Sequence, residues 1–259
     1  GQPGSLRFRV LPQGRSDPGG ASAGRKKRTG EHYKAPLSTK YIWGGATLNA
    51  RETARQAVKS SVVLLKNEGG VLPLPQGAKV ALFGWAQWDA VLSGNGSGAA
   101  RGGVSPSVVD ALKAVGVRPE ESLSAWYQDE FKAYHKDNPS EFDFTKIKDA
   151  VNSGLMYEIF GKYIPNPQEL LDEASRWTDT ALWIVGRKSG GEECDRRLEN
   201  DYYLSNQEKV LLEAICAHFP KVAVVLNGNG LMDLSWVEEH SQIQALLFLG
   251  VPGEEGPAA

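Results

Sequence analysis

The sequence predicts an α/β fold, more exactly a three-layer α/β sandwich with a mostly parallel sheet. Four segments are apolar at nearly every position, namely residues 79–84, 180–185, 221–226 and 243–249. Patterns typical of helices separate these segments along the chain. Strands without polar alternation are buried on both faces, and strands that alternate with helices form parallel sheets. We therefore expect two layers of helices around one central sheet.

A helix is expected at the start of the ordered chain. Order is predicted to begin near Tyr41, and Asn49 with Glu52 three residues later resembles a capping box. Apolar residues then recur at helical spacing as far as Leu65. The helix is predicted to end within residues 66–70, where two glycines supply a natural stop.

The middle of the chain predicts further helices around the first two strands. An extended connector at 71–75 leads into the first strand, and short helices are expected at 107–115 and 122–134. Residues 135–168 carry scattered aromatics and a Pro-Asn-Pro break, which indicate a long insertion with some helix. A helix at 168–177 is expected to precede the second strand.

The last third of the chain repeats the strand and helix alternation. Ser205 is predicted to cap a helix over 206–219. A short helical segment is expected to open at 234–236, between the last two strands. The predicted buried face of the capped helix consists of Val210, Leu211, Ala214, Ile215 and Phe219.

Charge divides the chain into two parts. Residues 1–40 hold nine basic and two acidic residues, whereas residues 41–259 hold 20 basic and 29 acidic residues. The first part is rich in Gly, Pro and Ser, which predicts a poorly ordered basic tail. The run Arg25-Lys-Lys-Arg28 is either a nucleic-acid patch or a solvated tail, and the simpler interpretation is the tail. The acidic net charge of 41–259 argues against nucleic acid as a natural ligand.

Several features bear on location and on the extent of the domain. The N-terminus shows no continuous apolar stretch of the kind found in signal peptides, and no apolar run is long enough to span a bilayer. Two cysteines do not form a disulfide framework, so a cytoplasmic location is expected. Residues 257–259 follow a strand and a turn and look like the first turn of a helix, which predicts a C-terminally truncated domain over 41–259.

Phosphate, metal and serine chemistry receive little support from the sequence. The loop Ser93-Gly-Asn-Gly-Ser-Gly98 is rich in glycine but matches no phosphate-binding fingerprint, which also argues against a doubly wound nucleotide-binding protein. Ser97 within it lacks the spacing of a nucleophile elbow. The four histidines show no ligand spacing, so no metal and no cofactor are expected.

The most chemically suggestive segment follows the second predicted strand. Residues 186–205 form a glycine-rich loop that contains Glu192 and Glu193 together with three arginines. Open α/β sheets place their chemistry in loops at the carboxyl ends of parallel strands. From the residues alone, the two carboxylates are either solvated or paired with arginine, or one of them is a general acid with a raised pKa.

Five segments, in the same order along the chain, resemble glycoside hydrolase family 3. Each of them is similar to a characteristic segment of that family, including "VLLKNE-x-x-LPL", "R-x-SGEG-x-DR" and "VVLN-x-G-x-x-D-x-SW". The five segments of this chain are Ala57–Leu74, Gly186–Arg196, Asp201–Ser205, Val224–Trp236 and Pro252–Gly256.

The resemblance implies one domain of a larger enzyme, the (α/β)6 sandwich. Such enzymes also carry a TIM-like barrel with a nucleophilic aspartate, and no barrel and no nucleophile motif is expected here. Residues 81–98 look most like members in which the sandwich precedes the barrel. The implied function is that of a retaining, exo-acting β-glycosidase, most similar to a β-glucosidase, acting on a β-linked oligosaccharide or β-glucoside. The alternative is a non-catalytic carbohydrate-binding or structural module, and the isolated chain is expected to be inactive.

The resemblance also implies roles for particular residues. Counting back from the Asp195-Arg196 pair indicates Glu192 as the general acid/base, with Glu193 in reserve at a position where the family usually has glycine. Asp195 and Arg196 are expected to shape the loop through a charge-assisted bond. Arg187 is expected to shape the loop as well. The predicted substrate-binding residues are Trp85, Trp88 and Ser97, although core packing is an equal alternative for both tryptophans.

Overall fold

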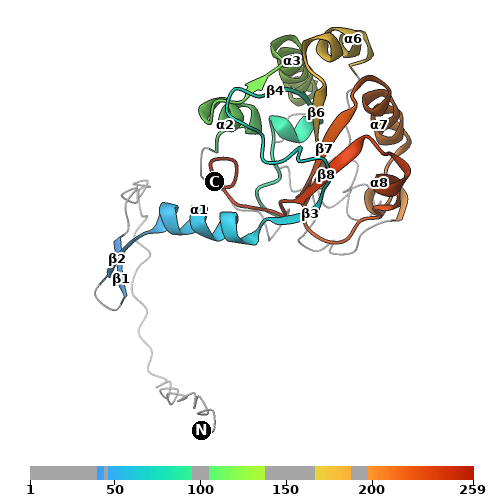
Figure 1. Cartoon of the computed structure of the whole chain (residues 1–259). Coiled ribbons are helices and arrows are strands. Elements are labelled where there is room, and N and C mark those ends of the chain that lie inside the picture. Colours follow the sequence, from blue (N-terminus) through green and yellow to red (C-terminus); the bar gives the residue numbers. More distant parts are fainter. Residues whose placement is uncertain (1–39, 44–45, 95–104, 138–166, 188–197) are drawn as a thin grey trace, which may run out of the picture. The chain divides into compact units, whose positions relative to one another are not determined.

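A computed structural model describes residues 40–43, 46–94, 105–137, 167–187 and 198–259 (Figure 1). Residues 38–259 form one unit, and residues 1–37 form another that lies outside the described residues. The predicted poorly ordered tail therefore stays a prediction. The same holds for the insertion over 135–168, of which only the two ends are described.

Six strands form one mixed sheet, in the order β3-β8-β7-β6-β4-β5. Within this sheet β3 runs antiparallel to β8, and the remaining pairings are parallel. The expected mostly parallel sheet is therefore confirmed, together with the four predicted strands. The strands are β3 (Val63–Asn67), β4 (Lys79–Phe83), β5 (Arg118–Pro119), β6 (Thr180–Arg187), β7 (Lys221–Gly228) and β8 (Ile243–Phe248).

The parallel register brings the carboxyl ends of the central strands to one edge of the sheet. Arg187 at the end of β6 pairs with Gly228 at the end of β7, and Leu226 pairs with Phe248 of β8. The connections that leave β4, β6, β7 and β8 consequently emerge at this carboxyl edge. The opposite, amino edge is formed by the first residues of the same strands, where Thr180 pairs with Lys221.

One face of the sheet is covered by a thick layer of helices. The side chains between this layer and the sheet are large, and several are fully buried aromatics. Phe83 meets Phe219 edge to face at 5.5 Å between ring centroids, and Trp183 meets Trp236 at 5.6 Å. The helices of this layer are α3 (Glu121–Asp137), α6 (Gln168–Trp177), α7 (Asn206–His218) and α8 (Ser235–Glu239).

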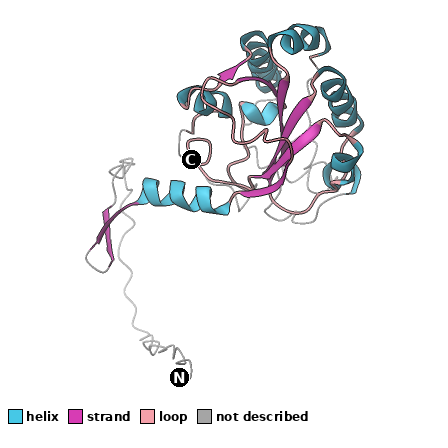
Figure 2. Ribbon diagram, in the orientation of Figure 1, coloured by secondary structure: helices cyan, strands magenta, loops and turns pink. Residues whose placement is uncertain are grey.

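The second face is covered by fewer elements and smaller side chains. Helix α2 (Val108–Ala114), the short 3-10 helix η1 (Trp85–Gln87) and the connector at 71–74 pack there. Their partners on the sheet include Val80, Ala223 and Ala245. Figure 2 shows the strands between the two sets of helices, as a three-layer sandwich requires.

The buried face of α7 differs in part from the predicted face. Val210 is 55% exposed, so its expected place in the core is wrong. Leu211, Ile215 and Phe219 are buried as expected, and Leu212 and Cys216 join them. The buried residues of α7 recur three and four positions apart, as one helix face requires, and Val210 lies on the adjacent, exposed side of that face, while Ala214 is half-buried at its border.

The predicted N-terminal helix is too long. Helix α1 (Ala50–Ser61) begins where expected, because the Asn49 side chain accepts hydrogen bonds from the backbone N–H groups of Arg51 and Glu52. It ends at Ser61, and the next residues form strand β3 instead of continuing the helix to Leu65. Pairing with β8 satisfies the backbone of this β-branched and apolar segment, and such tertiary pairing overrides a local helical period.

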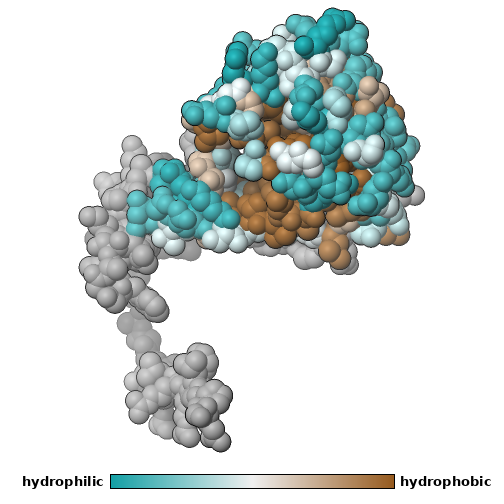
Figure 3. All heavy atoms as spheres, in the orientation of Figure 1, coloured by the Kyte–Doolittle hydropathy of each residue, from teal (hydrophilic) through white to brown (hydrophobic). Residues whose placement is uncertain are grey.

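Two short strands precede α1, and the strand that follows it lies at the outer edge of the sheet. Strands β1 (Lys40–Trp43) and β2 (Ala46–Asn49) pair antiparallel immediately before α1. As the outer strand, β3 leaves Val63, Leu64 and Leu65 each about half exposed. Figure 3 shows apolar side chains gathered beside the end of α1, where this strand lies.

Candidate functional site

The candidate site lies at the carboxyl edge, where the loop that follows β6 leaves the sheet. β6 lies between β7 and β4, at the middle of the sheet, and its last residue is Arg187. Among the residues predicted to act in catalysis or to shape the loop, Arg187 is described, whereas the others lie outside the described residues, and so does Ser97. Their roles therefore stay predictions, which concern Glu192, Glu193, Asp195, Arg196 and Ser97.

Arg187 forms a buried, two-pronged ion pair with Glu208 of α7. Arg187 Nη1 donates to Glu208 Oε1 at 2.5 Å, and Arg187 Nη2 donates to Glu208 Oε2 at 3.0 Å. The two residues are only 7% and 5% exposed. A paired guanidinium and carboxylate in this geometry are strongly and directionally bound.

The remaining donors of Arg187 bind backbone carbonyls on both sides of the loop. Arg187 Nη1 donates to the carbonyl of Gly186 at 2.9 Å, and Arg187 Nε donates to the carbonyl of Asp201 at 3.0 Å. Gly186 precedes the loop and Asp201 follows it, in the short π-helical turn η3 (Leu198–Tyr202). One side chain therefore joins the strand that enters the loop to the turn that leaves it.

Glu208 also takes part in the N-terminal cap of α7. The backbone N–H of Ser205 donates to Glu208 Oε2 at 2.8 Å, and the backbone N–H of Glu208 donates to Ser205 Oγ at 3.2 Å. These two bonds complete a capping box, which confirms Ser205 as the cap. The sequence interpretation missed Glu208, although its position three residues after a capping serine is a signal that could have found it.

The two tryptophans with predicted substrate contacts both have packing partners. Trp85 of η1 lies against the end of β6, since a Cβ atom built on Gly186 would stand 2.5 Å from Trp85 Cζ2. Trp88 Nε1 donates to the carbonyl of Ser124 at 3.0 Å, and its ring packs against the core. These contacts agree with the packing alternative, and the substrate role of both residues stays a prediction.

Asn227, near the end of β7, binds the connections that follow β4 and β8. The sequence interpretation missed this residue as well. Its amide Nδ2 donates to the carbonyls of Val91 at 3.0 Å and Gly250 at 2.8 Å, and its Oδ1 accepts from the backbone N–H of Val91 at 2.7 Å. The side chain is 1% exposed. A polar residue at the end of the otherwise apolar strand β7 is the signal that could have found it.

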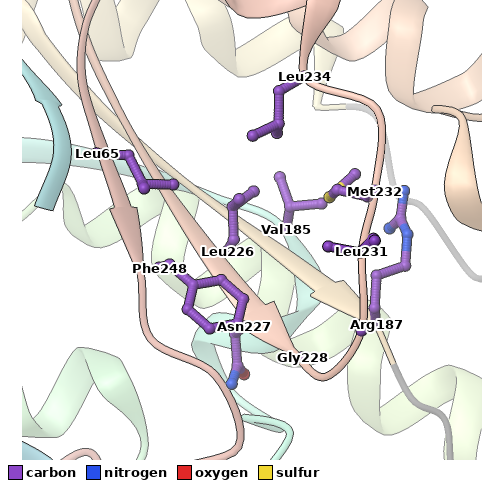
Figure 4. Close-up of a pocket in the computed structure, with 11 residues that line it drawn as sticks. Leu65, Val185, Arg187, Leu226, Asn227, Gly228, Leu231, Met232, Leu234 and Phe248 are labelled. Carbon is purple, nitrogen blue, oxygen red and sulfur yellow. The ribbon is translucent and has the colours of Figure 1, made fainter. Parts of the chain in front are cut away.

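An apolar pocket of about 250 Å³ opens at the carboxyl edge, beside Arg187 (Figure 4). Most of its walls are apolar side chains from β3, β6, β7, β8 and the connection after β7. Arg187 and Asn227 supply its polar groups. The lining residues are Leu65, Val185, Arg187, Leu226, Asn227, Gly228, Gly230, Leu231, Met232, Leu234 and Phe248.

Burial changes the ionisation of two groups on the thick helical layer. Burial raises the pKa of the Tyr127 hydroxyl well above its usual value of 10.0, against a smaller opposing effect of a backbone hydrogen bond with Gly84 at the end of β4. Burial likewise raises the pKa of the Cys216 thiol to about 12, with a further contribution from the charge of Glu213. Cys216 is therefore a core residue whose thiol stays protonated at neutral pH.

Two further features of the described ranges concern metal ions and membranes. Within them, no group of three or more His, Cys, Asp or Glu side chains is arranged to hold a metal ion. No helix in the same part of the chain is both long and apolar enough to cross a membrane.

Fold and site together define a class of protein. The chain is a three-layer α/β sandwich whose central strand β6 leads into a charged loop at the carboxyl edge, the position at which open α/β sheets place their sites. The profile of the Glycosyl hydrolase family 3 C-terminal domain matches residues 62–259. The chain therefore belongs to glycosyl hydrolase family 3, and its residues 62–259 correspond to the C-terminal domain of that family.

The relatives and solved structures most similar to this chain include several β-glucosidases. β-Glucosidase A of Butyrivibrio fibrisolvens is 29% identical over 231 residues, which cover 80% of this chain and 26% of that protein. A β-glucosidase of Ruminococcus albus is 29% identical over 212 residues, covering 80% of this chain and 21% of that protein. The chain spans about a quarter of the length of these curated relatives.

Solved structures of β-glucosidases contain a domain with the same fold. A β-glucosidase of Paenibacillus barengoltzii superposes with a TM-score of 0.68 at 28% identity, over 85% of this chain and 23% of that one. β-Glucosidase 3B of Thermotoga neapolitana, solved in complex with glucose, superposes with a TM-score of 0.65 at 25% identity, over 80% of this chain and 28% of that one.

Proposed function

We propose that this chain is the sandwich half of a retaining, exo-acting β-glucosidase and supplies its general acid/base, Glu192. The observation that carries the proposal is the position of the Glu192 segment. It lies directly after the central strand β6, inside the region that matches the family, and the similar proteins are β-glucosidases. The proposed substrate is a β-glucoside or a β-linked oligosaccharide.

The proposed reaction needs two carboxyl groups with different tasks. A carboxylate nucleophile attacks the anomeric carbon, while the protonated Glu192 gives its proton to the departing glycosidic oxygen. Glu192, now ionised, then removes a proton from water, which attacks the glycosyl-enzyme and releases the sugar. In retaining enzymes these two carboxyl groups stand roughly 5–5.5 Å apart.

The nucleophile is proposed to come from a TIM-like barrel domain, which would be this domain's partner in the parent enzyme. By parent enzyme we mean a polypeptide that carries this chain together with such a barrel. A retaining mechanism requires both carboxylates. We therefore propose that the isolated chain has no hydrolytic activity, although the folded sandwich is present.

The decisive experiment compares Glu192→Ala with Glu193→Ala in the parent enzyme. Removing the acid/base slows alkyl glucosides, which need a protonated leaving group, far more than 2,4-dinitrophenyl β-glucoside, which does not. Azide should then restore turnover of the activated substrate and form a β-glucosyl azide. We expect this behaviour from Glu192→Ala, and near wild-type rates from Glu193→Ala.

The outcomes separate the possible assignments. Azide rescue of Glu193→Ala but not of Glu192→Ala would assign the acid/base to Glu193. A parent enzyme that hydrolyses no glucoside would contradict the proposed function and support a non-catalytic module. The isolated chain, assayed with 4-nitrophenyl β-glucoside, should release no nitrophenol above the buffer blank. Turnover by this chain that Glu192→Gln abolishes would contradict the requirement for a barrel.

A further inference from the structure

We infer that Glu208 is a positioning residue, which acts through Arg187 to hold both ends of the segment that bears the proposed acid/base. The inference rests on the proposed function for its catalytic part. Its structural part rests on described residues alone, because the contacts involved lie before and after the segment at 188–197. We refer to the group Arg187, Asp201, Ser205 and Glu208 as the neck.

The neck connects three different elements through the side chain of Arg187, which forms ion pairs with both Glu208 and Asp201. Arg187 ends β6, the carbonyl of Asp201 belongs to η3, and Glu208 lies in the first turn of α7. Arg187 binds the carbonyl of Asp201 through Nε and the carboxylate of Glu208 through Nη1 and Nη2. A change at Glu208 therefore leaves the guanidinium with the carbonyls of Gly186 and Asp201 and with the Asp201 carboxylate, whose Oδ1 lies 3.9 Å from Nε.

Because the Arg187–Glu208 pair is buried, it fixes the positions of the chain segments that it joins as well as balancing their charge. Both side chains are more than nine-tenths buried, and Glu208 accepts three hydrogen bonds, two from Arg187 and one from the backbone of Ser205. Groups that are buried and fully bonded adopt one geometry, because each alternative leaves a charge without a partner. The neck thus fixes where the segment starts and where it ends.

Precise placement of these ends has a catalytic consequence. A general acid must lie within hydrogen-bond reach of the departing oxygen, and small displacements of a catalytic group cost large factors in rate. Glu192 is separated from Arg187 by four residues and from Asp201 by eight. The neck is the nearest rigid support on both sides of it among the described residues.

The first arm of the test uses this chain and follows amide hydrogen exchange. The reporter is the backbone N–H of Tyr203, which donates to the carbonyl of Leu198 at 2.9 Å and not to Glu208. Glu208→Gln should speed exchange in peptides covering 198–205 by roughly tenfold or more, equivalent to about 1.4 kcal/mol. Peptides from β7 serve as the internal reference for global stability.

A matched control removes a charge in the same way at an exposed pair. Asp179→Asn breaks the contact with Lys221 at the amino edge, where both side chains are about half exposed, and should leave both sets of peptides unchanged. Arg187→Lys is the second neck variant, in case Glu208→Gln does not fold. It keeps the charge but loses the fork, so an intermediate acceleration is expected.

The second arm uses the parent enzyme and compares two leaving groups. If the neck positions the acid, Glu208→Gln should lower kcat/KM for an alkyl β-glucoside roughly tenfold or more while changing that for 2,4-dinitrophenyl β-glucoside little. A smaller folded fraction would lower both values equally.

Each outcome bears on a different statement. Unchanged exchange at 198–205 in both neck variants overturns the inference regardless of activity. Accelerated exchange with an equal loss for both substrates overturns the positioning role and leaves the proposed function intact. A parent enzyme without any glucosidase activity overturns the proposed function, while accelerated exchange would still support the structural neck.

Discussion

The two edges of the parallel sheet use similar polar residues in opposite environments. At the amino edge, Lys221 Nζ donates to Asp179 Oδ2 at 2.8 Å, and both side chains are about half exposed. At the carboxyl edge, Arg187 and Glu208 form the same kind of pair almost completely out of contact with water. Water solvates Lys221 and Asp179 whether or not they pair, so that pair adds little to the free energy of unfolding. Breaking the buried Arg187–Glu208 pair costs far more, although the distances between the paired atoms are similar.

The amide side chains of the chain repeat this contrast. Asn67 bonds both backbone groups of Leu72 at an exposed position, and Asn227 bonds Val91 in the same manner at a buried one. Asn227 also binds the carbonyl of Gly250, so it joins the connections after β4, β7 and β8. Buried polar groups therefore gather at the edge that presents the proposed site, which favours a defined geometry there.

The largest expected effect is the loss of one member of the buried pair. Arg187→Met should lower the free energy of unfolding by about 3–5 kcal/mol, because Glu208 is left buried and charged without its main partner. The measurement is urea unfolding followed by circular dichroism. Arg187→Met combined with Glu208→Leu should recover part of the loss, because Glu208 is no longer left charged, while the Ser205 N–H and Asp201 still lack these partners. A double variant less stable than the single one would contradict an unpaired Glu208 as the main cost.

Replacement of the buried amide should come next in size. Asn227→Ala leaves the N–H and carbonyl of Val91 and the carbonyl of Gly250 without this partner, which should cost about 2–4 kcal/mol in the same unfolding assay. Asn67→Ala is the matched control and should cost about 1 kcal/mol or less, since water replaces its bonds. Equal losses for the two variants would contradict the contrast between buried and exposed positions.

The buried hydroxyl of Tyr127 predicts a loss of stability at alkaline pH. Its pKa is raised above 10.0 in the folded chain, so the unfolded chain loses this proton first as the pH increases. Stability should therefore be unaffected below pH 10 and should fall above it by about 1.4 kcal/mol per pH unit for this group. Tyr127→Phe should flatten that part of the profile in urea unfolding. An unchanged slope between pH 10 and 11 would contradict the prediction.

The smallest effect is expected at the exposed pair. The hydrogen bond from Lys221 lowers the pKa of Asp179, with a smaller contribution from Thr180. The resulting stabilisation is present above the usual carboxyl pKa and disappears as the pH falls through the lowered value. Because the pair is exposed, Asp179→Asn should cost less than about 1 kcal/mol at pH 7, and 1 M salt should remove most of the difference. A larger cost that persists in salt would contradict the assignment of this pair as weak.

Local patterns were sufficient for much of the fold. The helix at Gln168–Trp177 lies where its apolar period predicts it, and the capping box at Ser205 marks the start of α7. Strands β6 and β7 are apolar along nearly their whole length, a pattern found in strands that are covered on both faces of the sheet. These features depend on neighbours within one turn or one strand, so the sequence alone carries them.

Other features depend on partners that are distant in the chain. The helical period extends to Leu65, yet residues 63–67 form β3 because a strand some 180 residues later offers hydrogen bonds to them. The partner of Asn227 lies 136 residues away, and the partner of Arg187 lies 21 residues away. No local rule identifies such contacts, because they arise when the parallel register brings separate connections to one edge.

The sequence by itself determined the sandwich class, the family and the segment that carries the proposed acid/base, since apolar periods, caps and motifs are local properties. Only the tertiary structure decided which charges and amides are buried, because burial depends on what packs above a residue. It thereby showed that Arg187, at the end of β6, binds both Glu208 of α7 and the carbonyl of Asp201 in η3, in a geometry that is fixed by the cost of leaving a buried charge unpaired.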